Sequence, residues 1–166
     1  MSANPTTATT ASAPRALTTR HRSTIARAAL YLGALSVLAT GVVHIQQYSD
    51  QNYSSVPTIG TLFLLNFISA VVIGLGLIAP YGRIAGRYAD AIRAAWAVAG
   101  IGLAVLSLIA LFVSESSSLF NFHENGYRTP IVLAIVAEAA AAVFLLVFLA
   151  ANGTGLAKLN STHRTH

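Results

Sequence analysis

The sequence predicts an all-α membrane protein, a bundle of four transmembrane helices. Hydrophobic residues make up 55% of the 166 residues and charged residues only 9%, whereas a soluble domain carries about 25% charged residues. Four continuous apolar runs approach or exceed the roughly 20 residues that span a bilayer. Lipid admits only helices and closed barrels, and the runs do not alternate in polarity, so helices are expected. This composition argues against a soluble enzyme, a disordered chain and a nucleic-acid-binding protein.

Proline and glycine mark the limits of the expected helices. Pro57 and Pro130 fit the first turn of a helix, where a missing N–H group costs nothing. Pro80, which is followed by Tyr and Gly, ends the second run, and Asn152-Gly153 ends the fourth. The expected helices therefore cover about residues 26–46, 58–79, 92–114 and 129–151.

Two tails flank the expected transmembrane domain over residues 24–151. Residues 1–23 are rich in Ala, Thr and Ser and contain arginines but no acidic residue, so a disordered basic tail is expected. Such a leader also resembles an organelle transit peptide, and the run from Ala28 resembles the apolar part of a secretory signal. No clear cleavage site precedes His44, which favours an uncleaved first helix. Residues 152–166 are expected to form the second tail.

The basic residues predict the orientation in the membrane. All of the ten Lys and Arg residues except Arg128 flank the same ends of the expected helices. Because positively charged loops stay in the cytoplasm, both tails are expected there. The Ala- and Arg-rich composition favours a bacterial plasma membrane, and a basic flank attracts anionic lipid. The bilayer is thus an expected partner, and nucleic acid is not.

Glu138 is the residue at membrane depth that most requires an explanation. It lies nine residues after Thr129, roughly 13 Å below the outer boundary, where a charge costs about 2.5–3.5 kcal/mol. The other runs offer Asn66, Ser107 and Ser36 at similar depth, so a polar layer of these four side chains is expected. Two interpretations stay open. The carboxyl group binds a proton or ion in an oligomeric transporter, or it stays protonated, bonds to Asn66 and only joins helices.

The expected outer face carries a second set of candidate ligands. Counted from Arg27, His44 lies near the outer boundary, and His123 and Glu124 lie in another outer loop. With Asp50, these groups suit zinc, copper or non-haem iron, and two imidazoles suit haem. The spacing matches no metal motif, so a polar rim is the alternative interpretation.

The sequence contains no motif for nucleophilic catalysis, phosphate binding or zinc proteolysis, and no cysteine. This favours a non-enzymatic protein and leaves its cofactors unknown. Gly74-x-Gly76 and Gly100-x-Gly102 lie inside apolar runs, where small residues allow close helix contact. Short loops and small helix faces favour an accessory or structural subunit of a larger membrane complex or a homo-oligomer. The proton-linked transporter and the outer-face redox protein are the alternatives.

Part of the chain resembles a known group of proteins. The resemblance is carried by His44, by Pro-Thr-Ile-Gly from Pro57, by Leu-Phe-Leu-Leu-Asn ending at Asn66, and by Ala-Glu-Ala around Glu138. These segments resemble small four-helix membrane proteins common in actinobacteria, whose function is generally unassigned. The resemblance covers about residues 25–151 and implies the same fold, but it implies no catalytic or binding residue.

Overall fold

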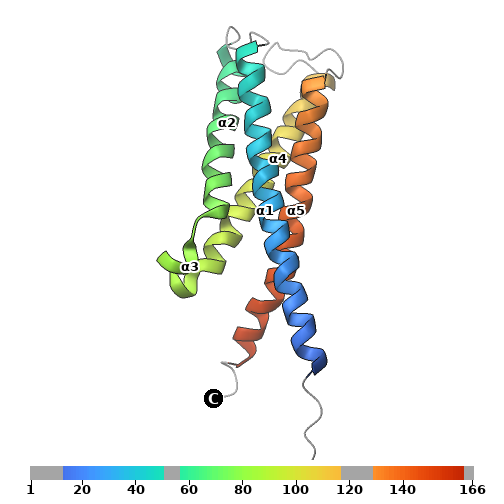
Figure 1. Cartoon of the computed structure of the whole chain (residues 1–166). Coiled ribbons are helices and arrows are strands. Elements are labelled where there is room, and N and C mark those ends of the chain that lie inside the picture. Colours follow the sequence, from blue (N-terminus) through green and yellow to red (C-terminus); the bar gives the residue numbers. More distant parts are fainter. Residues whose placement is uncertain (1–12, 51–56, 117–128, 163–166) are drawn as a thin grey trace, which may run out of the picture.

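The computed structural model describes residues 13–50, 57–116 and 129–162, with side chains over 23–50, 58–114 and 129–153. Every regular element in these ranges is helical: α1 (Ala13–Asp50), α2 (Pro57–Ile78), α3 (Tyr81–Ile84), the 3-10 helix η2 (Gly86–Tyr88), α4 (Ala89–Ser116) and α5 (Thr129–Thr162). Figure 1 shows that α1, α2, α4 and α5 form one elongated bundle.

Four segments are long and apolar enough to cross a membrane, and they are Ser23–Asp50, Thr58–Ile78, Gly86–Ser114 and Thr129–Gly153. Large apolar side chains such as Leu35, Val72, Leu106 and Val136 are exposed around the bundle, as expected where lipid replaces water. The predicted all-α bundle of four transmembrane helices is confirmed.

Two helices are longer than the sequence predicts. α1 begins at Ala13, inside the tail for which the sequence predicts disorder over residues 1–23, and α5 continues through Gly153 to Thr162. An established helix extends at low cost because its nucleus is already formed, and one internal Gly costs only about 1 kcal/mol. Among the described glycines, Gly86 has a positive φ, +49°, so Gly153 does not form the expected left-handed cap.

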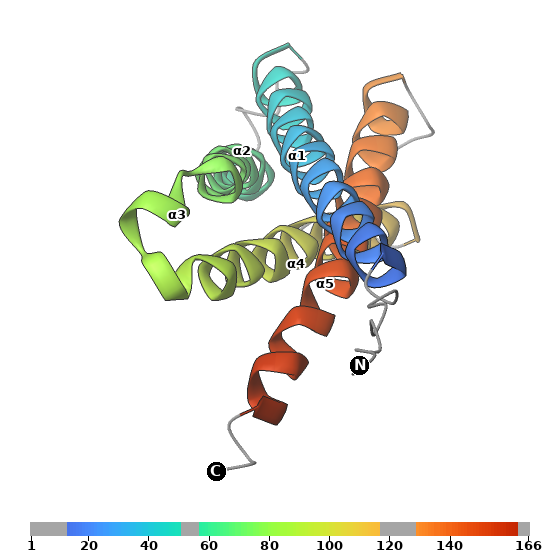
Figure 2. The same ribbon diagram turned by 60° about the horizontal axis from the view of Figure 1, so that its bottom comes forward.

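The four long helices form a ring of antiparallel neighbours. α1 packs along α2 and α5, and α4 packs against the same two helices, while α1 and α4 touch at few points. The end of α1, the start of α2, the end of α4 and the start of α5 all lie at the upper end of Figure 1. α3, η2, the start of α1 and the end of α5 lie at the lower end, which comes forward in Figure 2.

The apolar core lies in the lower half of the bundle and includes Val37 of α1, Ile73 and Leu77 of α2, Ala97 of α4 and Leu145 of α5. Leu145 is fully buried and occupies space left by two glycines. A Cβ atom at Gly33 would lie 2.6 Å from Leu145 Cδ2, and one at Gly100 would lie 2.7 Å from Leu145 Cδ1. The small residues of α1 and α4 therefore let α5 approach both helices.

At the lower end, α2 and α4 are joined by Trp96. Its indole ring lies against Gly76, where an added Cβ would come within 2.6 Å of Trp96 Cδ2. The indole N–H donates a hydrogen bond to the Tyr81 hydroxyl over 2.7 Å. Trp96 therefore joins α4 to both α2 and α3 at the lower end.

The contact between α1 and α2 depends on Gly41. A methyl group at this position would lie 2.9 Å from the Cβ atom of Ala70, which is too short for two carbon atoms on packed helices. We expect Gly41→Ala to force the helices apart and destabilise the bundle, because overpacking costs about 1–3 kcal/mol. Thermal unfolding in detergent, followed by circular dichroism, measures the change.

Gly102→Ala is the matched control for Gly41→Ala. No atom outside the local helix lies within 4 Å of its added Cβ, so this variant should match or exceed the wild type through helix propensity. If Gly41→Ala is as stable as Gly102→Ala, the close approach of α1 to α2 is wrong.

Candidate intramembrane polar site

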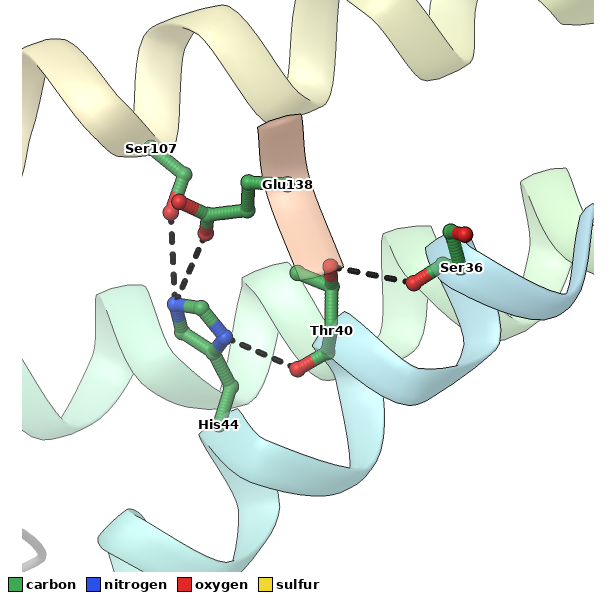
Figure 3. A network of polar contacts seen from close by, with 5 residues as sticks. All are labelled: Ser36, Thr40, His44, Ser107 and Glu138. Atoms are coloured by element: carbon green, nitrogen blue, oxygen red, sulfur yellow. Dashed lines mark hydrogen bonds and ion pairs between the residues drawn. The ribbon is translucent and has the colours of Figure 1, made fainter. Parts of the chain in front are cut away.

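Glu138 occupies the middle of the bundle. Its side chain projects from α5 toward α1 and α4 (Figure 3), and the residue is 1% exposed. A single ionised carboxylate in such a site is expensive, because neither water nor lipid solvates it there. Its neighbours therefore decide which protonation states are accessible.

His44 of α1 is the titratable neighbour of Glu138 within the described chain. Nε2 of the imidazole lies 3.8 Å from Oε1 of Glu138 and 3.3 Å from the hydroxyl oxygen of Ser107 on α4. The Ser107 hydroxyl also lies beside the Glu138 carboxyl group (Figure 3). Three helices thus each contribute one polar side chain to the same point.

The other nitrogen of His44 fixes the tautomer. Nδ1 lies 2.9 Å from the backbone carbonyl oxygen of Thr40, one turn earlier in α1. A carbonyl oxygen only accepts hydrogen bonds, so Nδ1 carries a proton and donates it. Nε2 is consequently the nitrogen that accepts or binds a second proton, and it is the nitrogen that faces Glu138.

One proton can therefore be placed at two positions in this pair. Either Glu138 is a neutral carboxylic acid beside a neutral imidazole, or Glu138 is a carboxylate beside an imidazolium. Both states have zero net charge, which suits a buried site. The 3.8 Å between Nε2 and Oε1 exceeds hydrogen-bond length, so the Ser107 hydroxyl is placed to connect them.

A cavity of about 300 Å³ adjoins this pair. It lies toward the upper end of the bundle and is lined by side chains of α1, α2, α4 and α5, most of them apolar. Its polar lining consists of His44, Gln47, Asn66, Ser69, Ser107, Ser114 and Glu138.

Two oxygen atoms at this cavity have no hydrogen-bond partner among the described residues. They are Oε1 of Glu138 and Oδ1 of Asn66, and both atoms are buried. A buried acceptor without a donor costs about 1–3 kcal/mol. The site therefore carries unused capacity to accept hydrogen bonds.

The structure brings together three of the four side chains of the expected polar layer. Asn66, Ser107 and Glu138 all line the cavity. Ser36 does not, because its hydroxyl donates to the Leu32 carbonyl oxygen over 2.9 Å, inside its own helix. Its carbonyl oxygen instead accepts the Thr40 hydroxyl over 3.2 Å.

His44 lines the same cavity, whereas counting from Arg27 predicts only that it lies near the outer boundary. α1 continues to Asp50, so His44 lies six residues, or roughly 9 Å, below the upper end of the helix. The spacing of Ser36, Thr40 and His44 at every fourth residue is a sequence signal of one polar helix face. Gln47 extends this face and is 5% exposed.

The expected outer-face metal or haem site lies largely outside the described residues. His123 and Glu124 fall in the range 117–128, and Asp50 is exposed. Within the described chain no three His, Cys, Asp or Glu side chains come close enough to hold a metal ion. Among the described residues His44 faces Glu138, and the outer-face metal or haem site stays a prediction.

Comparison with family models, with curated proteins and with solved structures finds no match. The resemblance to small actinobacterial membrane proteins stays a prediction.

The tautomer of His44 is directly measurable. We expect its neutral ring to carry the proton on Nδ1, because the Thr40 carbonyl oxygen lies 2.9 Å from this nitrogen. Nitrogen-15 NMR of histidine-labelled protein distinguishes the two ring nitrogens, and the signal lost in His44→Gln identifies the residue. A proton on Nε2 in the neutral ring would contradict the assignment.

Proposed function

We propose that the protein is a proton-linked membrane carrier in which Glu138 and His44 hold the exchanged proton. One observation carries the proposal: a carboxyl group that is 1% exposed faces an imidazole at 3.8 Å beside a cavity of about 300 Å³. Ionisable groups within membrane spans commonly mark pathways for protons and substrates.

The proposal follows from the charge of the pair. With one proton shared, the pair is neutral. When that proton leaves, Nδ1 still carries the proton that it donates to Thr40, so the pair has a charge of −1. This charge is buried and needs compensation, which couples loss of the proton to binding of another group in the cavity.

Four spans are few for a single-chain carrier, so the proposed form is a homo-oligomer. The exposed apolar side chains on all four long helices suit contact with lipid or with another subunit. An accessory subunit of a larger membrane complex, which the short loops favour, stays a prediction. Copurification of one different chain at fixed stoichiometry, seen by native mass spectrometry, would support that alternative.

The proton-linked proposal is tested by infrared difference spectroscopy between acidic and alkaline buffer. We expect the band of a neutral carboxyl group in an apolar environment to disappear at alkaline pH, and we expect Glu138→Gln to lack this band. Asp50→Asn is the matched control, because Asp50 is an exposed carboxylate, and it should leave the band unchanged.

A carboxyl band that does not respond to pH would contradict the proposed role of Glu138. If its carboxyl band is unchanged between acidic and alkaline buffer, the residue stays protonated and only joins helices. The proton-linked carrier would then be excluded.

We further propose that the protein lies in the plasma membrane with both chain ends in the cytoplasm. Arg83 of α3 and Arg87 of η2 lie at the lower end of the bundle, as do the start of α1 and the end of α5. Positively charged segments favour the cytoplasmic side.

Cysteine labelling tests this orientation, since the natural chain has no cysteine. We expect Ser54→Cys, between α1 and α2, to react with an impermeant maleimide on intact cells. Ala85→Cys, between α3 and η2, should react only after the membrane is opened. The reverse pattern would invert the proposed topology.

A further inference from the structure

We propose that the cavity binds a small lipophilic amine in its protonated form, in exchange for the proton of the Glu138–His44 pair. This inference rests on the proposed function and names the substrate class for the same site. It is carried by the unpartnered acceptors, the charge of the lining and the shape of the cavity.

The acceptors decide which polar group the ligand presents. Oε1 of Glu138 and Oδ1 of Asn66 are buried and have no donor among the described residues, and both residues line the cavity. A ligand that fits must donate hydrogen bonds. A protonated amine donates up to three, whereas an alcohol donates one and a quaternary ammonium group donates none.

The charges around Glu138 favour a cation over a neutral donor. From α1, His44 faces the carboxyl group; α2 contributes Asn66 and α4 contributes Ser107, both uncharged. The cavity lining contains no Lys or Arg. After the shared proton leaves, the buried charge of −1 therefore finds no compensating cation in the lining, and a bound ammonium group restores zero net charge.

The volume and the apolar lining of the cavity indicate the rest of the ligand. A cavity of about 300 Å³ is about twice the 150 Å³ that accommodates benzene in an engineered apolar site. It has room for one aromatic ring and a short arm. Phe63, whose ring centroid lies 5.2 Å from that of His44, forms part of an apolar wall for such a ring.

The route into the cavity runs between α2 and α4. Its lining includes Leu62, Leu65 and Leu106, which are 42%, 53% and 68% exposed on the outside of the bundle. At the lower end Trp96 of α4 lies against Gly76 of α2, whereas the cavity lies between these helices toward the upper end. A ligand that dissolves in the bilayer can enter here.

The exchange balances without an oxidant or reductant. The ammonium ion enters with its N–H bonds intact, and the pair releases one proton to water. Hydrogen bonds form from the ammonium group to Glu138 and Asn66. One proton is released for each amine bound, and the site is neutral before and after.

Binding of 2-phenylethylamine to the full chain in lipid nanodiscs tests the inference, with empty nanodiscs subtracted. Isothermal titration calorimetry in buffers of different ionisation enthalpy counts the protons released. We expect saturable binding with one proton released per amine. 2-Phenylethanol should release none, and the trimethylammonium analogue of the amine should bind more weakly because it has no N–H group.

Three variants locate the site. Glu138→Gln should abolish both binding and proton release, and Asn66→Leu should weaken binding about tenfold or more, the effect of losing a hydrogen bond to a charged group. Asp50→Asn, which changes an exposed carboxylate, should bind as the wild type does. Circular dichroism of each variant shows whether the helices are still folded. If Glu138→Gln unfolds, the weaker binding of a folded Asn66→Leu still tests the site.

The outcomes distinguish this inference from the proposed function. If the amine does not bind although the Glu138 carboxyl group loses its proton in the infrared measurement, the amine is the wrong substrate and the proton-linked carrier stands. Equal binding of the alcohol, or amine binding unaffected by Glu138→Gln, overturns the inference as well. Equal binding of the trimethylammonium analogue overturns the role of the unpartnered acceptors.

Discussion

The burial of one carboxyl group constrains the arrangement of the upper half of this bundle. Glu138 is 1% exposed and lies in a segment that can span a membrane, where an isolated charge is costly. The neighbouring helices place polar side chains around this carboxyl group. His44 approaches from α1, and Ser107 from α4.

The backbone of α1 determines how this group can work. Because the Thr40 carbonyl oxygen lies 2.9 Å from Nδ1 of His44, the opposite nitrogen is directed at Glu138 and Ser107. A structural hydrogen bond within one helix thereby sets the chemistry between helices. The pair can hold one proton at zero net charge, and release of this proton leaves a buried charge of −1 that a bound cation can compensate.

Close contacts between helices surround this site from below. Gly33 and Gly100 make space for Leu145, which brings α5 close to α1 and α4. Gly41 makes space for Ala70, which brings α1 close to α2. Trp96 of α4 packs against Gly76 of α2 and donates a hydrogen bond to Tyr81 of α3. Above these contacts α2 and α4 enclose the cavity with the other two helices, next to the unpartnered oxygens.

Much of this arrangement follows from the sequence by counting residues. Apolar runs predict the four helices, and equal depth predicts that Glu138, Asn66 and Ser107 lie near one another. Depth alone does not show which side of a helix a residue faces. The prediction therefore also includes Ser36, whose hydroxyl donates to a carbonyl oxygen of its own helix. It also ends the first helix near residue 46 rather than at Asp50, because no glycine or proline marks this end.

The cavity and the unpartnered oxygens could not be predicted, because they depend on how four helices pack. They arise where side chains of all four helices meet above a core organised by glycines. The sequence identifies which residues are small, but it does not say which neighbour fills the space beside each one. Gly102, which has no neighbour within 4 Å of its added Cβ, illustrates the difference.

The central claim is that Glu138 and His44 share one proton. It is tested most directly by an NMR titration of protein labelled with carbon-13 at glutamate Cδ and nitrogen-15 in histidine, in lipid. Our account predicts that the Glu138 carboxyl signal and the His44 Nε2 signal change together, at one common midpoint, with loss of one proton. Two separate midpoints, or a carboxyl signal that never changes, would contradict it.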